Sequence, residues 1–333
     1  MTNGDFIRRR ALRPESGGAV PVRTVSMAKK VLAVLALGTA VAAGPATAAA
    51  SASEPDPGEY LGVWNYDQPD RGTMRNIAEI GCPADEPDCE SFIPGMPAGS
   101  VVRVPQIGRI VFAKGADGEV LGRTDRGCTW RFDVRRDSLE LAGDQTCENQ
   151  VIGSGYTLTS WTVRVDGRRE TEAIRGISHH EKNYDFALRR GFRTKDRTEP
   201  WRKAARRFTG RWTYAPADPA KMINIVARRT TGPDGTVHFE RSELRGAVDM
   251  LVRPDRTIVA RTPDGCRWTL AASGNTADLT PPAQTCRRAG ATVALDFWQV
   301  ASDGRRQASI MSGSVRRDGA TTRFLLNVGE LTR

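Results

Sequence analysis

The chain contains two similar sequence segments in tandem, and this repeat limits the possible folds more than any other feature. "GVWNY" at Gly62 matches "GRWTY" at Gly210, and "MRNIA" at Met74 matches "MINIV" at Met222, both pairs being 148 residues apart. Further along, "GCTWRF" at Gly127 matches "GCRWTL" 138 residues later. Two copies of about 130 residues, rather than many copies of 20 to 50, indicate paired domains and not a solenoid.

The repeat also divides the chain. The offset shortens by ten residues after Met74, which places an insertion in the first copy around Cys82 and Cys89. In the segment between the copies, Pro200 favours the start of a short helix. The first copy, the linker and the second copy are predicted at 58–195, 196–207 and 208–333.

Strand patterns dominate within each copy. "TLTSWTVRV" from Thr157 alternates apolar and polar residues, and "GADGEV" and "VDGRRE" carry Asp-Gly hairpin signals. We expect about eight short strands per copy, because no long run has a helical period. A closed barrel or a sandwich is indicated, since both deal with exposed strand edges.

The N-terminal residues have the pattern of an export signal. Lys29 and Lys30 precede the apolar run "VLAVLALGTAVAA", and small residues with A-x-A spacing follow. The run is shorter than the roughly 20 residues that a membrane-spanning helix needs. We expect residues 1–52 to be an N-terminal extension and secretory signal peptide, with either Met1 or Met27 as the true start. The released protein is then secreted and has no stable membrane insertion.

Six cysteines in an exported chain indicate three disulfides rather than metal or redox chemistry. Two pairs occupy the same places in the two copies, with spacings of 19 and 20 residues, and the remaining two cysteines are left for each other. No C-x2-C spacing suggests zinc. The predicted pairs are Cys128–Cys147, Cys266–Cys286 and Cys82–Cys89.

The opening of each copy resembles a known family. Gly62 to Trp64 and Gly210 to Trp212 read Gly-x-Trp, which is similar to the opening strand of lipocalins and other calycin-type eight-stranded barrels, whose Trp closes the barrel floor. The resemblance implies two tandem antiparallel β-barrels, an all-β fold stapled by disulfides, and a small ligand held inside. The copies are shorter than most lipocalins, and "KNYDFALRRGFR" echoes their later motifs only loosely.

A second resemblance is to small secreted bacterial inhibitors of metalloproteases. These are also eight-stranded barrels that open with Gly-x-Trp, with one disulfide and text similar to "LELAGDQTC". In that family an N-terminal tail enters the protease cleft. The corresponding tail here is Ser53 to Glu59.

Strand alternation places the Trp and Tyr of each opening strand on one face, where they either line a ligand cavity or fill the core. A polar Asn recurs on an otherwise apolar face in both copies, either for a ligand or for a nearby backbone group. The ligand-binding candidates are Trp64, Tyr66, Asn76, Trp212, Tyr214 and Asn224.

Catalytic patterns are missing from the sequence. It contains no Gly-x-Ser-x-Gly elbow, no H-E-x-x-H and no phosphate-binding loop. His179-His180-Glu181 is the single histidine cluster, and neighbouring side chains on a strand point to opposite faces, which makes joint metal binding awkward. We therefore expect no catalytic residue, no metal and no cofactor. A hydrolase that uses His179 or His180 is the third hypothesis.

The distribution of charged residues limits the classes of partner that we expect. Without residues 1–50 the chain has 42 basic and 37 acidic side chains, and the second copy is the basic one, with 18 against 12. Basic residues are not interleaved with aromatic ones, which argues against nucleic acid. The second copy either associates weakly with acidic envelope polymers or is simply a solvated surface. The expected function is a secreted, non-catalytic binding protein, each barrel holding a small ligand or cell-envelope component, with protease inhibition and extracellular hydrolysis as alternatives.

Overall fold

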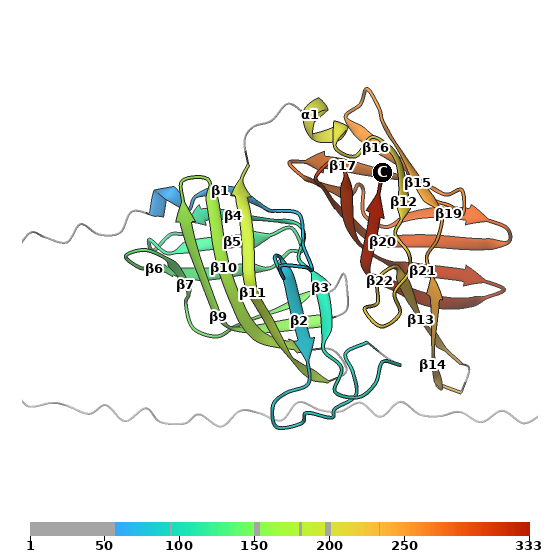
Figure 1. Cartoon of the computed structure of the whole chain (residues 1–333), viewed down its shortest axis with the longest axis horizontal. Helices are drawn as coiled ribbons and strands as arrows, with labels where there is room; N and C mark the ends of the chain where they lie inside the picture. Colours follow the sequence, from blue (N-terminus) through green and yellow to red (C-terminus); the bar gives the residue numbers. More distant parts are fainter. Residues whose placement is uncertain (1–56, 94, 150–153, 180–181, 197–200, 233) are drawn as a thin grey trace, which may run out of the picture. The chain divides into compact units, whose positions relative to one another are not determined.

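The structure, a computed structural model, describes residues 57–333 except 94, 150–153, 180–181, 197–200 and 233 (Figure 1). These residues belong to one compact unit, Ser53–Arg333. They are nearly all β-structure, arranged as two closed antiparallel barrels in tandem. The predicted fold class is confirmed. The predicted signal peptide lies outside the described residues.

In the first barrel eleven strands fill eight positions around the ring. The strands β1 and β2 lie one after the other along β11, β4 and β3 pair with them on the other side, and β7 and β8 both pair with β9. Pairing of Trp64 with Lys195 closes the ring. The strands are β1 Gly62–Tyr66, β2 Ile77–Gly81, β3 Val102–Pro105, β4 Arg109–Lys114, β5 Val120–Thr124, β6 Thr129–Val134, β7 Leu139–Leu141, β8 Gln145–Asn149, β9 Ser154–Asp166, β10 Arg169–His179 and β11 Asn183–Lys195.

The second barrel has the same topology, strand for strand. Pairing of Tyr214 with Leu331 closes it. Its strands are β12 Gly210–Tyr214, β13 Ile225–Thr231, β14 Val237–Glu243, β15 Ala247–Val252, β16 Thr257–Arg261, β17 Arg267–Ser273, β18 Thr276–Leu279, β19 Gln284–Arg288, β20 Ala291–Ser302, β21 Arg306–Arg317 and β22 Ala320–Thr332.

Two short helices flank the first barrel in the chain. A 3-10 turn, η1 Pro57–Glu59, precedes β1, and helix α1 Trp201–Arg206 follows Pro200 as the sequence predicts. Among the described residues, no helix is long and apolar enough to cross a membrane.

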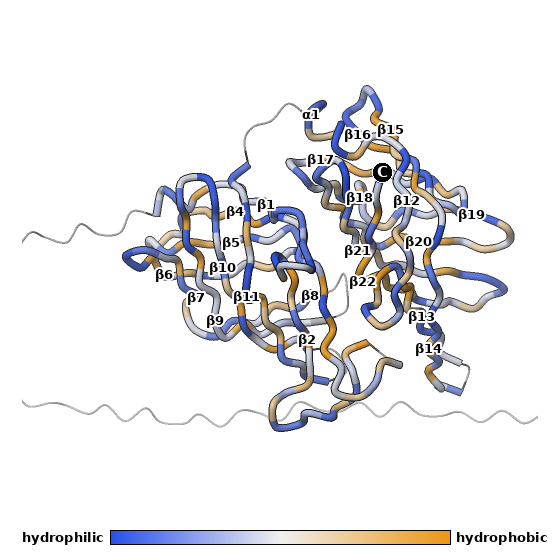
Figure 2. Tube along the Cα trace, viewed as in Figure 1, coloured by the Kyte–Doolittle hydropathy of each residue, from blue (hydrophilic) through white to orange (hydrophobic). Residues whose placement is uncertain are grey.

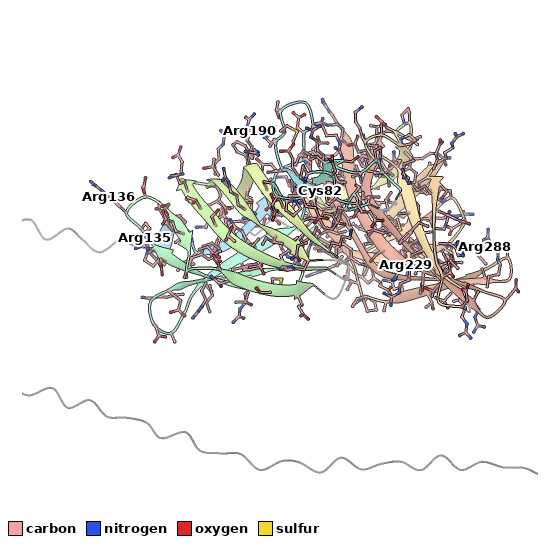
Figure 3. All side chains as sticks on the ribbon, turned by 90° about the horizontal axis from the view of Figure 1, so that it is seen from below. Cys82, Arg135, Arg136, Arg190, Arg229 and Arg288 are labelled. Atoms are coloured by element: carbon pink, nitrogen blue, oxygen red, sulfur yellow. A yellow bond between two sulfur atoms is a disulfide. The ribbon has the colours of Figure 1, made fainter. Side chains whose placement is uncertain are left out.

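The strands alternate between apolar and polar residues, as Figure 2 shows. Inward residues of the first barrel include Trp64, Phe112 and Phe132, all almost fully buried. Because a closed barrel has one inward and one outward face per strand, this alternation fills the interior with apolar side chains. Many arginines lie at the surface: Arg135, Arg136, Arg190, Arg229 and Arg288, labelled in Figure 3, are exposed.

The Gly-x-Trp motif has a definite structural task. Gly62 has a φ of 121°, which favours glycine. The indole nitrogen of Trp64, fully buried, donates to the carbonyl of Tyr60 at 2.6 Å, and the Lys195 amine lies 5.1 Å from its ring centroid. The motif thus joins the entering chain, the first strand and the last strand. In the second barrel the same positions are held by Gly210, Trp212, Phe208 and Arg333.

The three disulfides are the predicted pairs. Cys128–Cys147 joins the turn between β5 and β6 to β8, the short strand that pairs with β9. Cys266–Cys286 makes the same link in the second barrel, from the turn between β16 and β17 to β19, which pairs with β20. Cys82–Cys89 closes the inserted loop between β2 and β3, where the second barrel has a short turn. Disulfides of this kind persist in oxidising compartments outside the cytosol or in the cell envelope.

Candidate functional site

The second barrel encloses a cavity of about 430 Å³. The side chains that line one end of the cavity, its floor, are fully or almost fully buried, whereas those that line the other end, its upper wall, are half-buried. The cavity therefore opens to solvent at the end of the upper wall. The floor consists of Tyr214, Val226, Trp268, Leu295, Met311 and Leu326, and the upper wall of Leu244, Val293, Val315 and Phe324. These side chains give the interior an apolar surface of the kind that small-molecule sites have.

Charged residues gather at the mouth of this cavity. Glu243 is paired with Arg245 at 2.8 Å, and Asp264 accepts hydrogen bonds from the Thr262 hydroxyl and the Cys266 amide. Arg228 is different. It points inward from β13, is half-buried, and donates to the Ser242 hydroxyl at 2.5 Å, with no carboxylate within 4 Å in the described part of the chain. A cation without a carboxylate at the edge of an apolar space favours an anionic group there.

The first barrel is filled at the equivalent place, and its interior space is only about 100 Å³. Strand register shows why. Tyr156 pairs with Ser178 as Val293 pairs with Val315, so a tyrosine stands where the second barrel has valine. Tyr156 packs edge-on against Phe186, with ring centroids 5.5 Å apart. The larger side chain of Tyr156 therefore takes up part of the space that is open in the second barrel.

A buried ionic cluster fills more of the first barrel. The Nη1 atom of Arg193 lies 2.7 Å from a carboxylate oxygen of Glu170 and 2.7 Å from one of Glu172. The Trp161 indole also donates to Glu172 at 2.7 Å, and the guanidinium lies 4.0 Å from the centroid of the Tyr66 ring. None of the three charged residues is more than 5% exposed.

The charges in this cluster do not balance, because two carboxyls share one guanidinium. Burial raises the pKa of Glu170 to about 8, against the lowering effect of Arg193 and with a further rise from Glu172. One oxygen of each carboxyl and the Arg193 Nε have no hydrogen-bond partner. Glu170 is thus protonated near neutral pH, which leaves one carboxylate for one guanidinium.

The sequence analysis missed this cluster. Its signal was present in the repeat: the second barrel has neutral residues, Gln307, Ser309 and Leu331, at the register positions of Glu170, Glu172 and Arg193. Two acids on the inward face of an alternating strand, next to Ile174, stand out once the two copies are aligned.

The predicted ligand-binding residues separate into two groups. Tyr66 and Tyr214 line the interior spaces of their barrels. Burial raises the pKa of the Tyr214 phenol above its ordinary value, and Asp264 adds to this, so the group stays a neutral hydroxyl. Trp64 and Trp212 line neither space and are core residues bonded to the backbone.

Asn76 and Asn224 bond to nearby backbone groups, which is one of the two roles that the sequence leaves open for them. Asn76 is fully buried with a φ of 53°, and its amide donates to the carbonyls of Asp67 and Phe192 while accepting from the Phe192 amide. All its polar atoms are used by the backbone, so none is left for a ligand. Asn224 makes the same three bonds with Ala215 and Glu330.

The histidine cluster is only partly described, because His180 and Glu181 lie outside the described residues. The two ring nitrogens of His179 lie 2.7 Å from the Thr157 hydroxyl and 2.7 Å from the Asn183 amide oxygen. Within the described ranges no group of three or more His, Cys, Asp or Glu residues is placed to hold a metal ion.

Comparison with known proteins gives no family. No family model matches the chain, and no curated protein matches it. Two solved structures align over most of it. One is a protein with unknown function from the DUF3598 family of Nostoc punctiforme PCC 73102, at 8% identity over 83% of this chain and 96% of that one, with a TM-score of 0.19. The other, from Bacteroides fragilis NCTC 9343, is described as a "putative outer membrane protein", at 9% identity over 84% of this chain and 100% of that one, with a TM-score of 0.24.

Proposed function

We propose that this is a secreted, non-catalytic binding protein whose second barrel holds a small, mainly apolar molecule with an anionic end. The observation that carries the proposal is the cavity of about 430 Å³, apolar along its floor and wall, with Arg228 at its mouth. The sequence leads to the expectation that each barrel holds a ligand. The proposal assigns a ligand to the second barrel alone.

Size and chemistry both support this site. Pockets for small molecules typically measure about 300–1,000 Å³ and combine an apolar lining with a few placed polar groups. The space in the first barrel, about 100 Å³, is below that range. Arg228 is half-buried, so an anion bound to it is partly removed from water, where a charge-assisted hydrogen bond is stronger than on an open surface.

Export is supported by two features. The three disulfides suit an oxidising compartment. The apolar run in residues 1–52, followed by A-x-A spacing, suits a cleaved signal peptide. A calycin-like origin of the barrels agrees with the buried Gly-x-Trp at the start of each.

The structure gives less support to protease inhibition and to hydrolysis, the two alternative functions. The inhibitor hypothesis depends on the tail Ser53 to Glu59, of which residues 53–56 lie outside the described residues and Pro57–Glu59 form the turn η1. The hydrolase hypothesis depends on His179 and His180, and both ring nitrogens of His179 have hydrogen-bond partners.

The test is titration of the purified protein with 1-anilinonaphthalene-8-sulfonate, a dye with an apolar body and a sulfonate. We expect a saturable rise in its fluorescence with one site per chain, and displacement by decanoate. A signal that does not saturate, or that decanoate leaves unchanged, contradicts an interior site and assigns the dye to the surface.

Arg228→Leu is expected to weaken dye binding about ten- to a hundredfold, because the sulfonate loses a charge-assisted hydrogen bond of about 1.5–3 kcal/mol. The fluorescence titration measures the change. N-phenyl-1-naphthylamine, the uncharged analogue, should bind the variant and the original protein equally well. Equal loss for both dyes would mean that Arg228 shapes the cavity and does not bind the anion. Arg229→Leu, an exposed neighbour on the other face of β13, is the matched control.

A further inference from the structure

The second barrel carries a group of exposed arginines around the open end of its cavity. Three hairpins form this end: β13–β14, β19–β20 and β21–β22. Residues 229–239, 287–292 and 314–323, called the rim below, contain six arginines and two aspartates. The arginines are Arg229, Arg287, Arg288, Arg316, Arg317 and Arg323, all exposed, and Figure 3 labels Arg229 and Arg288.

Strand register places the rim next to the upper wall of the cavity. Val315 lines that wall on β21 and is followed by Arg316. Phe324 lines it on β22 and is preceded by Arg323. On β19, Arg287 is separated from Arg316 by a single strand, since both pair with the same residue of β20. Because successive side chains of a strand alternate between faces, these arginines lie on the outer face around an inward-facing apolar wall.

The charge of the rim is held at the mouth and is not neutralised by the barrel itself. The Nε atom of Arg288 donates to the carbonyl of Asp264, a residue of the cavity mouth, at 2.7 Å. Within the described ranges, the ion pairs of this barrel involve none of Arg287, Arg316 and Arg323. Their charge is therefore balanced by ions from solvent or by a partner.

The first barrel, whose interior space is small, lacks this charge. The register position of Arg287 is occupied there by Glu148. The position of Arg323 is occupied by Asp185, and both acidic residues are exposed. The two barrels have the same topology, so the fold does not require arginines at these positions. The basic rim therefore belongs to the barrel with the cavity and not to the barrel fold in general.

An exposed aromatic residue lies on the same outer face. Phe239 of β14 is 42% exposed and pairs with Arg229 of β13, which in turn pairs with Arg323 of β22. In the described part of the chain, it is the only aromatic residue among the large exposed hydrophobic ones. An apolar side chain beside basic ones is the combination that enters the boundary between lipid headgroups and acyl chains.

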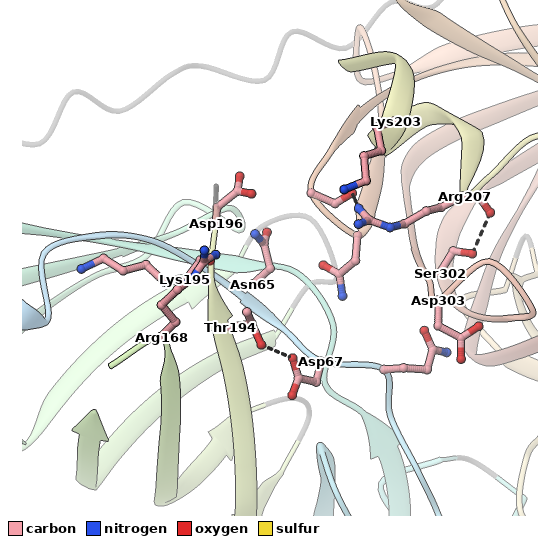
Figure 4. A pocket seen from close by; sticks show the side chains of 13 residues that line it. Asn65, Asp67, Arg168, Thr194, Lys195, Asp196, Lys203, Arg207, Ser302 and Asp303 are labelled. Atoms are coloured by element: carbon pink, nitrogen blue, oxygen red, sulfur yellow. Dashed lines mark hydrogen bonds between the residues drawn. The ribbon is translucent and has the colours of Figure 1, made fainter. Parts of the chain in front are cut away.

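A separate space of about 500 Å³ provides a contrast (Figure 4). Its lining includes four basic and three acidic residues: Arg168, Lys195, Lys203, Arg207, Asp67, Asp196 and Asp303. Charges of both signs favour no class of ligand, whereas the rim has an excess of positive charge. The rim therefore favours a partner with a surface of negative charge.

We propose that the rim of the second barrel docks on an anionic lipid surface, with Phe239 entering the headgroup layer and the mouth of the cavity facing the bilayer. An apolar molecule with an anionic end can then pass between the bilayer and the cavity without crossing open water. This passage rests on the proposed function, whereas docking itself does not. A soluble polyanion would also bind the arginines, but it gives no role to Phe239 or to an apolar opening at the same place.

The experiment is sedimentation of the purified protein with sucrose-loaded vesicles of phosphatidylcholine, with or without about 30% phosphatidylglycerol. We expect binding to the anionic vesicles, loss of that binding at high salt, and little binding to the neutral ones. Equal binding to both kinds of vesicle, or to neither, overturns the proposal. No ligand is added, so the two assignments fail separately: vesicle binding without dye binding removes the cavity proposal alone, and dye binding without vesicle binding removes the docking proposal alone.

Arg287→Glu with Arg323→Asp copies the first barrel at two rim positions. It should weaken binding to the anionic vesicles at least a hundredfold, because it changes four units of charge and each contributes about fivefold near such a surface. Binding of N-phenyl-1-naphthylamine should stay unchanged, since neither residue lines the cavity. The matched control is Arg136→Glu with Arg253→Asp, which makes the same change in net charge at exposed residues of the β6–β7 and β15–β16 turns. An equal loss in the control means that net charge rather than the rim attracts the vesicles, and the proposal is then wrong.

Phe239→Ala distinguishes a membrane from a soluble polyanion. It should weaken binding to the anionic vesicles several-fold, because it removes the apolar contact with the headgroup layer. Binding of inorganic polyphosphate, measured by isothermal titration calorimetry, should not change. If vesicle binding is also unchanged, the arginines alone bind the vesicles, and the rim is a polyanion site instead of a membrane-docking surface.

Discussion

Arg193→Leu is expected to lower the free energy of unfolding by about 3–5 kcal/mol, because it leaves a buried carboxylate without its cation. Arg193 is 2% exposed and bonds both Glu170 and Glu172 at 2.7 Å. Urea unfolding followed by Trp fluorescence measures the change, and Trp161, which contacts Glu172, reports on the first barrel directly.

The second barrel supplies the control for this prediction. The combined change Glu170→Gln, Glu172→Ser and Arg193→Leu copies its neutral residues at the same register positions. We expect this triple variant to be as stable as the original or more stable, because removing a whole buried ion cluster removes its desolvation cost as well. A loss as large as that of Arg193→Leu alone would contradict this view and show that the cluster stabilises the barrel on balance.

The cluster also predicts the pH dependence of stability. The pKa of Glu170 is raised by burial to about 8 in the folded protein, against about 4.3 in an unfolded chain. Between these values the folded state binds more protons, so the free energy of unfolding should fall as pH rises, by up to about 1.4 kcal/mol per unit. Urea unfolding at pH 5, 6.5 and 8 tests this. The slope should disappear in Glu170→Gln; if it persists there, another group causes it.

Val293→Tyr is expected to weaken binding of the anionic dye about a hundredfold or more, because the tyrosine fills the cavity of the second barrel. The first barrel shows the direction of the effect: with Tyr156 at that position and the ionic cluster beside it, its interior space is about 100 Å³ instead of about 430 Å³. Dye titration measures the loss, and the fold should survive, since the half-buried position accepts the larger side chain toward the mouth.

The reciprocal variant distinguishes loss of dye binding through filling of the cavity from loss through general disruption of the fold. Tyr156→Val opens the first barrel at the same register position and should leave dye binding to the second barrel unchanged. If Val293→Tyr binds the dye normally, the site lies elsewhere. If Tyr156→Val abolishes binding, the first barrel holds the ligand and the assignment of the two barrels is reversed.

The features that could be predicted from the sequence are those whose motifs occur in both copies. Two copies of Gly-x-Trp and two cysteine pairs at nearly equal spacing were enough to predict the tandem barrels and, with the remaining two cysteines, all three disulfides. Met74 and Asn76, repeated as Met222 and Asn224, belong to the same group, although their reason was backbone geometry: all four residues have positive φ. A repeated motif in this chain therefore marks what the fold requires.

The candidate sites could not be predicted in the same way, because they arise where the two copies differ. Whether a barrel is open depends on single exchanges such as Tyr156 for Val293, whose effect requires the pairing of distant strands. No local pattern connects residues that only the folded chain brings together.

The pairing of Trp64 with Lys195 also affects the order in which the chain can fold as it is synthesised from its N-terminus. The two residues are 131 positions apart, so the edge of β1 stays unpaired on that side until nearly the whole first copy has been synthesised. Contacts of such long range slow folding and leave strand edges open to wrong partners. Because each copy closes on itself, the first barrel can complete its ring before the second copy has been synthesised.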